Sequence, residues 1–138
     1  MIDVRGTTLR VDAVFLILAG MFGLVGDVLS YRSGTGPFGT TFFQNPTVIG
    51  VVEAHALAVL TAVTLWYCSQ QHAGTFGHWV GLSAHLVLGG SNIIWFEVFS
   101  RLQAETQGVA VTVVHFLFVA LNAFLIIRGG EDRLASRL

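Results

Sequence analysis

Four apolar runs, each long enough to cross a lipid bilayer as a helix, constrain this chain more than any other feature of its sequence. A hydrocarbon core about 30 Å thick needs about 20 helical residues at a rise of about 1.5 Å per residue. Runs of that length occupy residues 11–31, 48–68, 79–99 and 109–127. The segments between them hold glycine, proline or polar residues that favour turns. The sequence therefore predicts an all-α integral membrane protein, a left-handed four-transmembrane-helix bundle that forms a single domain.

Composition excludes several other classes of protein. Of the 138 residues, 54% are hydrophobic and 11% are charged, whereas an average soluble domain has roughly 25% charged residues. The mean hydropathy of +0.73 excludes a soluble globular domain and a disordered tail. A net charge of -1 leaves no basic patch for binding nucleic acid. Cys68 is the one cysteine, which excludes thiol–disulfide oxidoreductases because they need a cysteine pair.

The arginines predict the orientation of the spans. With four spans both termini lie on one side of the membrane, and that side collects five of the seven arginines. The five are Arg5, Arg10, Arg128, Arg133 and Arg137, and the two on the other side are Arg32 and Arg101. The positive-inside rule therefore places both termini in the cytoplasm, and we expect the chain in a bacterial inner membrane.

Ionisable side chains inside the predicted spans are the strongest indication of function, because each costs about 2.5–3.5 kcal/mol at mid-membrane. Counted from the predicted span ends, five of them lie within roughly 10 Å of the extracytoplasmic face. They are Asp27, Glu53, His55, Glu97 and His115. Every span contributes at least one, and no arginine or lysine inside a span can neutralise the carboxylates. The sequence predicts that these five side chains surround one polar cavity.

Structural roles compete with this prediction at several positions. Glu97 precedes Arg101 by four residues, a spacing that favours a simple ion pair on one helix. Glu53 and His55 are two residues apart and point in nearly opposite directions on a straight helix, so one of them faces elsewhere. His85 is counted closer to the cytoplasmic face, and we expect it outside the cluster.

The leading functional hypothesis is a small membrane enzyme that acts on a hydrophobic or lipid-like substrate. His55 and His115 would exchange protons with the substrate, with the carboxylates as their partners. The pocket would be walled by Trp95, Phe96, Phe116, Asn92 and Asn122. Aromatic faces in such a pocket stabilise developing positive charge. The expected partners are thus the lipid bilayer and an apolar small molecule.

Three other hypotheses stay open at this point. His55, His115 and Asp27 would suit a divalent metal ion, although H-E-x-x-H and E-x-x-H motifs are absent. His55 and His115 could instead bind a b-type haem as axial ligands, although the acidic neighbours would repel its propionates. The third hypothesis is a proton-coupled small transporter, working as a homodimer, or an accessory subunit of a membrane complex.

Overall fold

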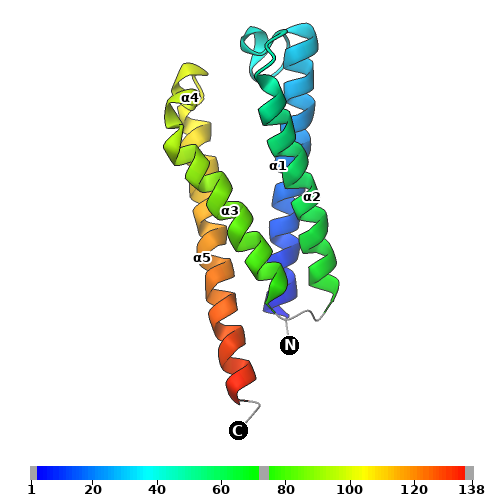
Figure 1. Cartoon of the computed structure of the whole chain (residues 1–138), viewed down its shortest axis with the longest axis vertical. Helices are drawn as coiled ribbons and strands as arrows, with labels where there is room; N and C mark the ends of the chain where they lie inside the picture. The colour runs from blue at the N-terminus through cyan, green and yellow to red at the C-terminus, as the bar shows by residue number, and fades with distance from the viewer. Residues whose placement is uncertain (1–2, 72–74, 136–138) are drawn as a thin grey trace. The chain divides into compact units, whose positions relative to one another are not determined.

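The computed structural model describes residues 3–71 and 75–135, which are helical apart from short connections (Figure 1). The long helices are α1 (Val4–Ser33), α2 (Val48–Gln70), α3 (Phe76–Ile94) and α5 (Glu105–Ala135). Between them lie the short helix α4 (Phe96–Arg101) and a 3₁₀ turn, η1 (Gly39–Thr41). Helices α1, α2 and α5 are long and apolar enough to cross a membrane. The prediction of an all-α chain with helices that suit a membrane is thus confirmed for the described residues.

The prediction of one continuous helix over residues 79–99 is wrong. Helix α3 ends at Ile94, Trp95 leaves the helical conformation with φ -113° and ψ 36°, and α4 begins at Phe96. Residues 89–92 are Gly-Gly-Ser-Asn, which are weak helix formers, and the β-branched and aromatic residues that follow lose side-chain freedom in a helix. Two histidines and an asparagine also lower the hydropathy of α3, which is not among the candidate spans.

The other helices extend beyond the apolar runs that predicted them. Helix α1 begins at Val4 rather than at residue 11, and α5 begins at Glu105 rather than at residue 109. Hydropathy marks the stretch that suits hydrocarbon, whereas backbone hydrogen bonding continues into the polar residues on either side. Depths counted from the ends of the apolar runs are therefore displaced from the true positions along the helices.

The described residues belong to two compact units, the first made of residues 1–12 and 64–138 and the second of residues 13–63. Within the first unit, α3 packs antiparallel against α5 (Figure 1). Within the second unit, the later part of α1 packs antiparallel against the first part of α2, with Gly20 beside Val59 and Gly23 beside His55. That the whole chain is a single domain stays a prediction.

Glycine allows α1 and α2 to approach closely in the second unit. A Cβ atom at Gly20 would lie 2.8 Å from Val59 Cγ2 and 2.9 Å from the carbonyl oxygen of His55. The second of these atoms belongs to the backbone and cannot rotate away. Small residues at a helix interface allow this kind of contact in membranes, where packing rather than the hydrophobic effect holds helices together.

Gly20→Ala should lower the free energy of unfolding by about 1–3 kcal/mol, because the methyl group forces the two helices apart. Gly50→Ala in α2 is the matched control, since nothing lies within 4 Å of a Cβ atom there. Thermal unfolding of both variants in one detergent measures the difference. If Gly20→Ala unfolded like Gly50→Ala, the close packing of α1 on α2 would be contradicted.

Candidate functional site

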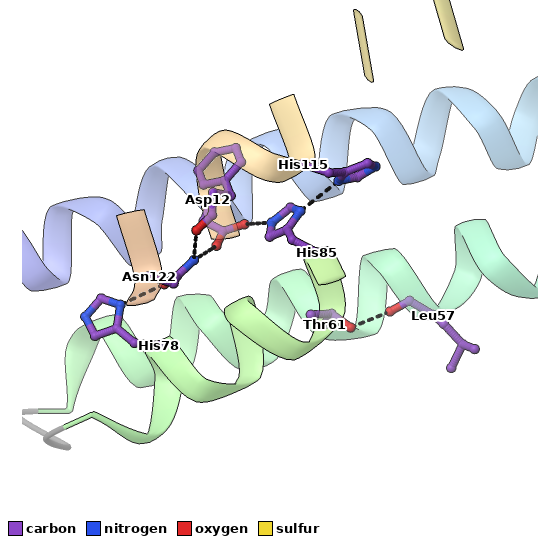
Figure 2. A network of polar contacts seen from close by, with 8 residues as sticks. Asp12, Leu57, Thr61, His78, His85, His115 and Asn122 are labelled. Carbon is purple, nitrogen blue, oxygen red and sulfur yellow. Dashed lines mark hydrogen bonds and ion pairs between the residues drawn. The ribbon is translucent and has the colours of Figure 1, made fainter. Parts of the chain in front are cut away.

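Five buried polar side chains form a continuous chain of contacts in the first unit (Figure 2). They are Asp12 of α1, His78 and His85 of α3, and His115 and Asn122 of α5, and we call them the polar chain. His115 is 9% exposed and the other four are 0% exposed. Polar groups this deeply buried destabilise a fold unless hydrogen bonds satisfy them.

Each link of the polar chain is a short hydrogen bond between side chains. The distance is 2.8 Å from His78 Nδ1 to Asn122 Oδ1, and 3.1 Å from Asn122 Nδ2 to Asp12 Oδ2. It is 2.7 Å from Asp12 Oδ1 to His85 Nε2, and again 2.7 Å from His85 Nδ1 to His115 Nδ1. Asp12 therefore occupies the middle of the chain and accepts bonds from both α3 and α5.

Two neighbouring residues shape the space around Asp12. Gly81 lies on α3 between the two histidines, and a Cβ atom there would be 2.9 Å from both Asn122 Nδ2 and Asp12 Oδ2. The ring of Phe118 stacks on the imidazole of His85, with centroids 4.8 Å apart and planes at 13°. Gly81 thus makes room for the carboxylate, and Phe118 holds the imidazole that faces it.

The proton positions in one branch of the polar chain are fixed. Asn122 Nδ2 lies 3.0 Å from the carbonyl oxygen of Phe118, which can only accept a hydrogen bond. The amide nitrogen of Asn122 therefore donates to Phe118 and to Asp12, and its oxygen faces His78. Because that oxygen can only accept, His78 carries its proton on Nδ1. His78 Nε2 is buried without a hydrogen-bond partner among the described atoms.

The other branch can reverse its direction. When Asp12 is ionised and both imidazoles are neutral, His85 donates from Nε2 to Asp12 and accepts from His115 Nδ1. When the branch gains one proton, His85 becomes an imidazolium that donates to both neighbours, and His115 carries its proton on Nε2. The bond between the two imidazoles can exist in both states, so this branch can hold or release a proton.

Asp12 is the acidic residue of the polar chain. No member of the polar chain is a permanent cation, and Arg5 in the first turn of α1 donates instead to the carbonyl oxygen of Leu125, 3.0 Å away. Asp12 Oδ1 lies 2.7 Å from His85 Nε2, and both side chains are completely buried. A buried carboxylate is costly without an opposite charge. A proton on His85 supplies that charge.

A second carboxylate–imidazole pair lies in the second unit. His55 Nδ1 is 2.6 Å from Asp27 Oδ2, and the structure thus brings together two of the predicted site residues. Asp27 is completely buried, whereas 29% of the His55 side chain is exposed. A Cβ atom at Gly23 would overlap the imidazole, so glycine is what allows the ring to lie against α1.

The remaining predicted site residues have diverse surroundings. Glu53, Glu97, Trp95 and Phe116 are exposed, and Phe96 and Asn92 are partly exposed. Asn122 is a member of the polar chain. His115 belongs to the first unit and pairs with His85, while His55 belongs to the second unit and pairs with Asp27. A cavity common to all five ionisable residues stays a prediction.

The prediction that His85 lies at a different depth from His115 is wrong, because the two imidazoles are hydrogen-bonded. The error arose because both depths were counted from the ends of the apolar runs, which differ from the ends of the helices. Asp12 and His78 were missed because they fall at the edges of predicted spans. One signal could have found His78: His78 and His85 are seven residues apart, as are His115 and Asn122, and antiparallel helices bring such pairs together.

The structure offers no ready metal site in the part of the chain that it describes. Within residues 3–71 and 75–135, no group of three or more His, Cys, Asp or Glu side chains is placed to hold a metal ion. Of the predicted ligands, Asp27 and His55 contact each other. A haem bound by His55 and His115 stays a prediction, because those residues belong to separate units.

No protein-family model, curated protein or solved structure matches this chain. Its function must therefore be argued from the chemistry of the site.

Asn122→Leu should lower the free energy of unfolding by about 1–3 kcal/mol, because it leaves Asp12 and His78 with unsatisfied buried groups. The control is Asn92→Leu in α3, which lies outside the polar chain and is partly exposed. It should change stability by less than about 0.5 kcal/mol. Chemical unfolding of the two variants in the same lipid bicelles compares them. Equal stability would contradict the polar chain as a structural unit.

Proposed function

We propose that this chain is a small integral-membrane protein that takes up and releases a proton at Asp12, His85 and His115, as a proton-coupled transporter does. The observation that carries the proposal is the hydrogen bond between His85 and His115, whose donor and acceptor can exchange. A buried site with this property binds a proton without any rearrangement of its side chains. The fixed branch through Asn122 supports the same function, since it holds Asp12 in place.

In this proposal, the proton moves from the least buried group of the branch to the most buried ones. His115 is the least buried member of the switchable branch, so the proton enters there, on Nε2. The proton that His115 carried on Nδ1 then passes to His85 along the hydrogen bond that joins them. His85 becomes an imidazolium beside the carboxylate of Asp12. Release follows the same path in reverse. Both steps use the hydrogen bonds that join His115, His85 and Asp12.

Protonation changes the charge at the interface of α3 and α5. Without the added proton, the three side chains have a net negative charge in a buried place, and with it they are neutral. Any movement that brings water to Asp12 is therefore favoured in the first state and disfavoured in the second. A transporter can couple a conformational change to proton binding through this difference.

We propose further that α3 crosses the membrane as a fourth span beside α5. Its polar side chains, which lower its hydropathy, are paired with α5 by hydrogen bonds, and this pairing reduces the cost of placing them in lipid. Helix α5 is itself a candidate span, and α3 runs antiparallel along it. Four spans return both termini to one side, which the five-to-two division of arginines makes cytoplasmic, as in a bacterial inner membrane.

A membrane enzyme for hydrophobic substrates is the second candidate function, and its basis is the pair Asp27 and His55. A buried carboxylate behind a partly exposed imidazole is an arrangement that serves general acid–base catalysis. A partly exposed ring on a lipid-facing helix pair can meet a substrate dissolved in the bilayer. Because this pair lies in the other unit, variants of Asp12 separate the two functions.

Single cysteines at Ser33, Thr75 and Gln103 in a Cys68→Ala background test the number of spans. With four spans, a membrane-impermeant maleimide added outside should label Ser33→Cys and Gln103→Cys and leave Thr75→Cys unlabelled until the membrane is opened. If α3 did not cross, Gln103→Cys would behave like Thr75→Cys. That pattern would contradict the fourth span.

Proton binding can be followed through the imidazole ¹⁵N resonances of the full chain in lipid nanodiscs during a pH titration. The signals of His85 and His115 should change together in one step that takes up one proton, because both rings belong to the same switch. Asp12→Asn should abolish that joint step, since the amide cannot compensate an imidazolium. His55 should titrate as before and is the internal control. Independent titration of His85 and His115 would overturn the proposal.

A further inference from the structure

We infer that Asp27 and His55 form a binding site for an apolar molecule that carries a hydroxyl group, and that this molecule arrives directly from the lipid. The inference shares this pair with the second candidate function but requires no turnover. It therefore stands or fails separately from catalysis. It is also independent of the proton site at Asp12.

The first argument concerns the proton on His55. Asp27 Oδ2 accepts a hydrogen bond from His55 Nδ1 at 2.6 Å, which fixes the proton of the neutral imidazole on Nδ1. The Nε2 atom then has a lone pair and can only accept. A carboxylate behind an imidazole also holds the ring in one orientation. His55 Nε2 is thus an acceptor in a defined position, beside Gly23 of α1.

The second argument concerns the other oxygen of Asp27. Asp27 Oδ1 is buried and has no hydrogen-bond partner among the described atoms. His55 is therefore the only described residue with a hydrogen bond to the side chain of Asp27. The connection after α1 covers this region, since Pro37 packs on Gly26, and Gly36 lies close to the hydroxyl of Ser30. Water is kept from the carboxylate, which strengthens its effect on the imidazole.

The third argument concerns access. The imidazole of His55 is 29% exposed, and both helices that hold it are candidate membrane spans. Both helices expose large apolar side chains, among them Phe22 of α1, which is 76% exposed, and Ile49 of α2, which is 63% exposed. A ligand that reaches this surface comes through hydrocarbon, where a charged donor such as an ammonium group is costly. A neutral hydroxyl on an apolar body fits both the acceptor and the route.

The test uses two probes that differ in one property, 4-nonylphenol and its methyl ether 4-nonylanisole. Both partition into lipid, but only the phenol can donate a hydrogen bond. Added to the ¹⁵N-histidine-labelled full chain in nanodiscs, the phenol should shift the His55 Nε2 resonance saturably and the ether should leave it unchanged. A shift of equal size with both probes, or no shift with the phenol, would overturn the inference.

Variants locate the site. Asp27→Asn should weaken phenol binding about tenfold, since a neutral amide polarises the imidazole less, and Gly23→Ala should abolish binding because it displaces the ring. Glu53→Gln is the matched control, an exposed carboxyl two residues from His55 that should leave binding unchanged. Binding that Asp27→Asn leaves intact would also overturn the inference.

Two further measurements keep the proposals apart. Asp12→Asn, which disables the proton site, should leave phenol binding unchanged as long as its helical circular dichroism matches that of the unaltered chain. A loss of binding by such a folded variant would contradict a site made by Asp27 and His55. Mass spectrometry of the recovered phenol reports on catalysis alone. A phenol that binds and returns unaltered supports the binding site, whatever it implies for the second candidate function.

Discussion

The packing of α3 and α5 around α1 in the first unit depends on one buried carboxylate, that of Asp12. Among the described residues, no arginine takes part in the hydrogen bonds of its side chain. Asp12 is completely buried, and its hydrogen bonds come from Asn122 on α5 and His85 on α3. Donors from two other helices must therefore remain in place for Asp12 to be satisfied, which ties the first turns of α1 to α3 and α5. Gly81 and Phe118 serve the same requirement, one by leaving space and the other by holding the imidazole.

The described residues contain two carboxylate–imidazole pairs of nearly equal length, and the two pairs differ in their surroundings. Asp12 and His85 are both enclosed, and the proton exchange that we propose for this pair therefore passes through a third group, His115. Asp27 is enclosed but His55 is partly exposed, so that imidazole can meet another molecule itself. The two proposed roles, proton storage and ligand binding, thus follow from the burial of the pairs more than from their residue types.

Hydropathy predicted the apolar helices because a helix that crosses a bilayer needs an apolar run of about 20 residues. Such a run can be found in any sequence that contains it. It could not predict the break at Trp95, which depends on the weak helix formers before it. The pairing of Asp27 with His55 was within reach, since both were counted near one face. The link from His85 to His115 was not, because a depth counted from apolar ends carries an error of about one turn or more of helix at each end.

The equal spacing in the polar chain also determines how α3 and α5 align. His78 and His85 are seven residues apart, and His115 and Asn122 repeat that interval in the opposite direction. A slip of one heptad either way would form one different polar pair and leave two buried polar side chains unmatched. Two buried polar groups without partners destabilise such an alignment strongly. The polar chain thereby fixes the register of α3 against α5, because it makes one alignment of the two helices more stable than the others.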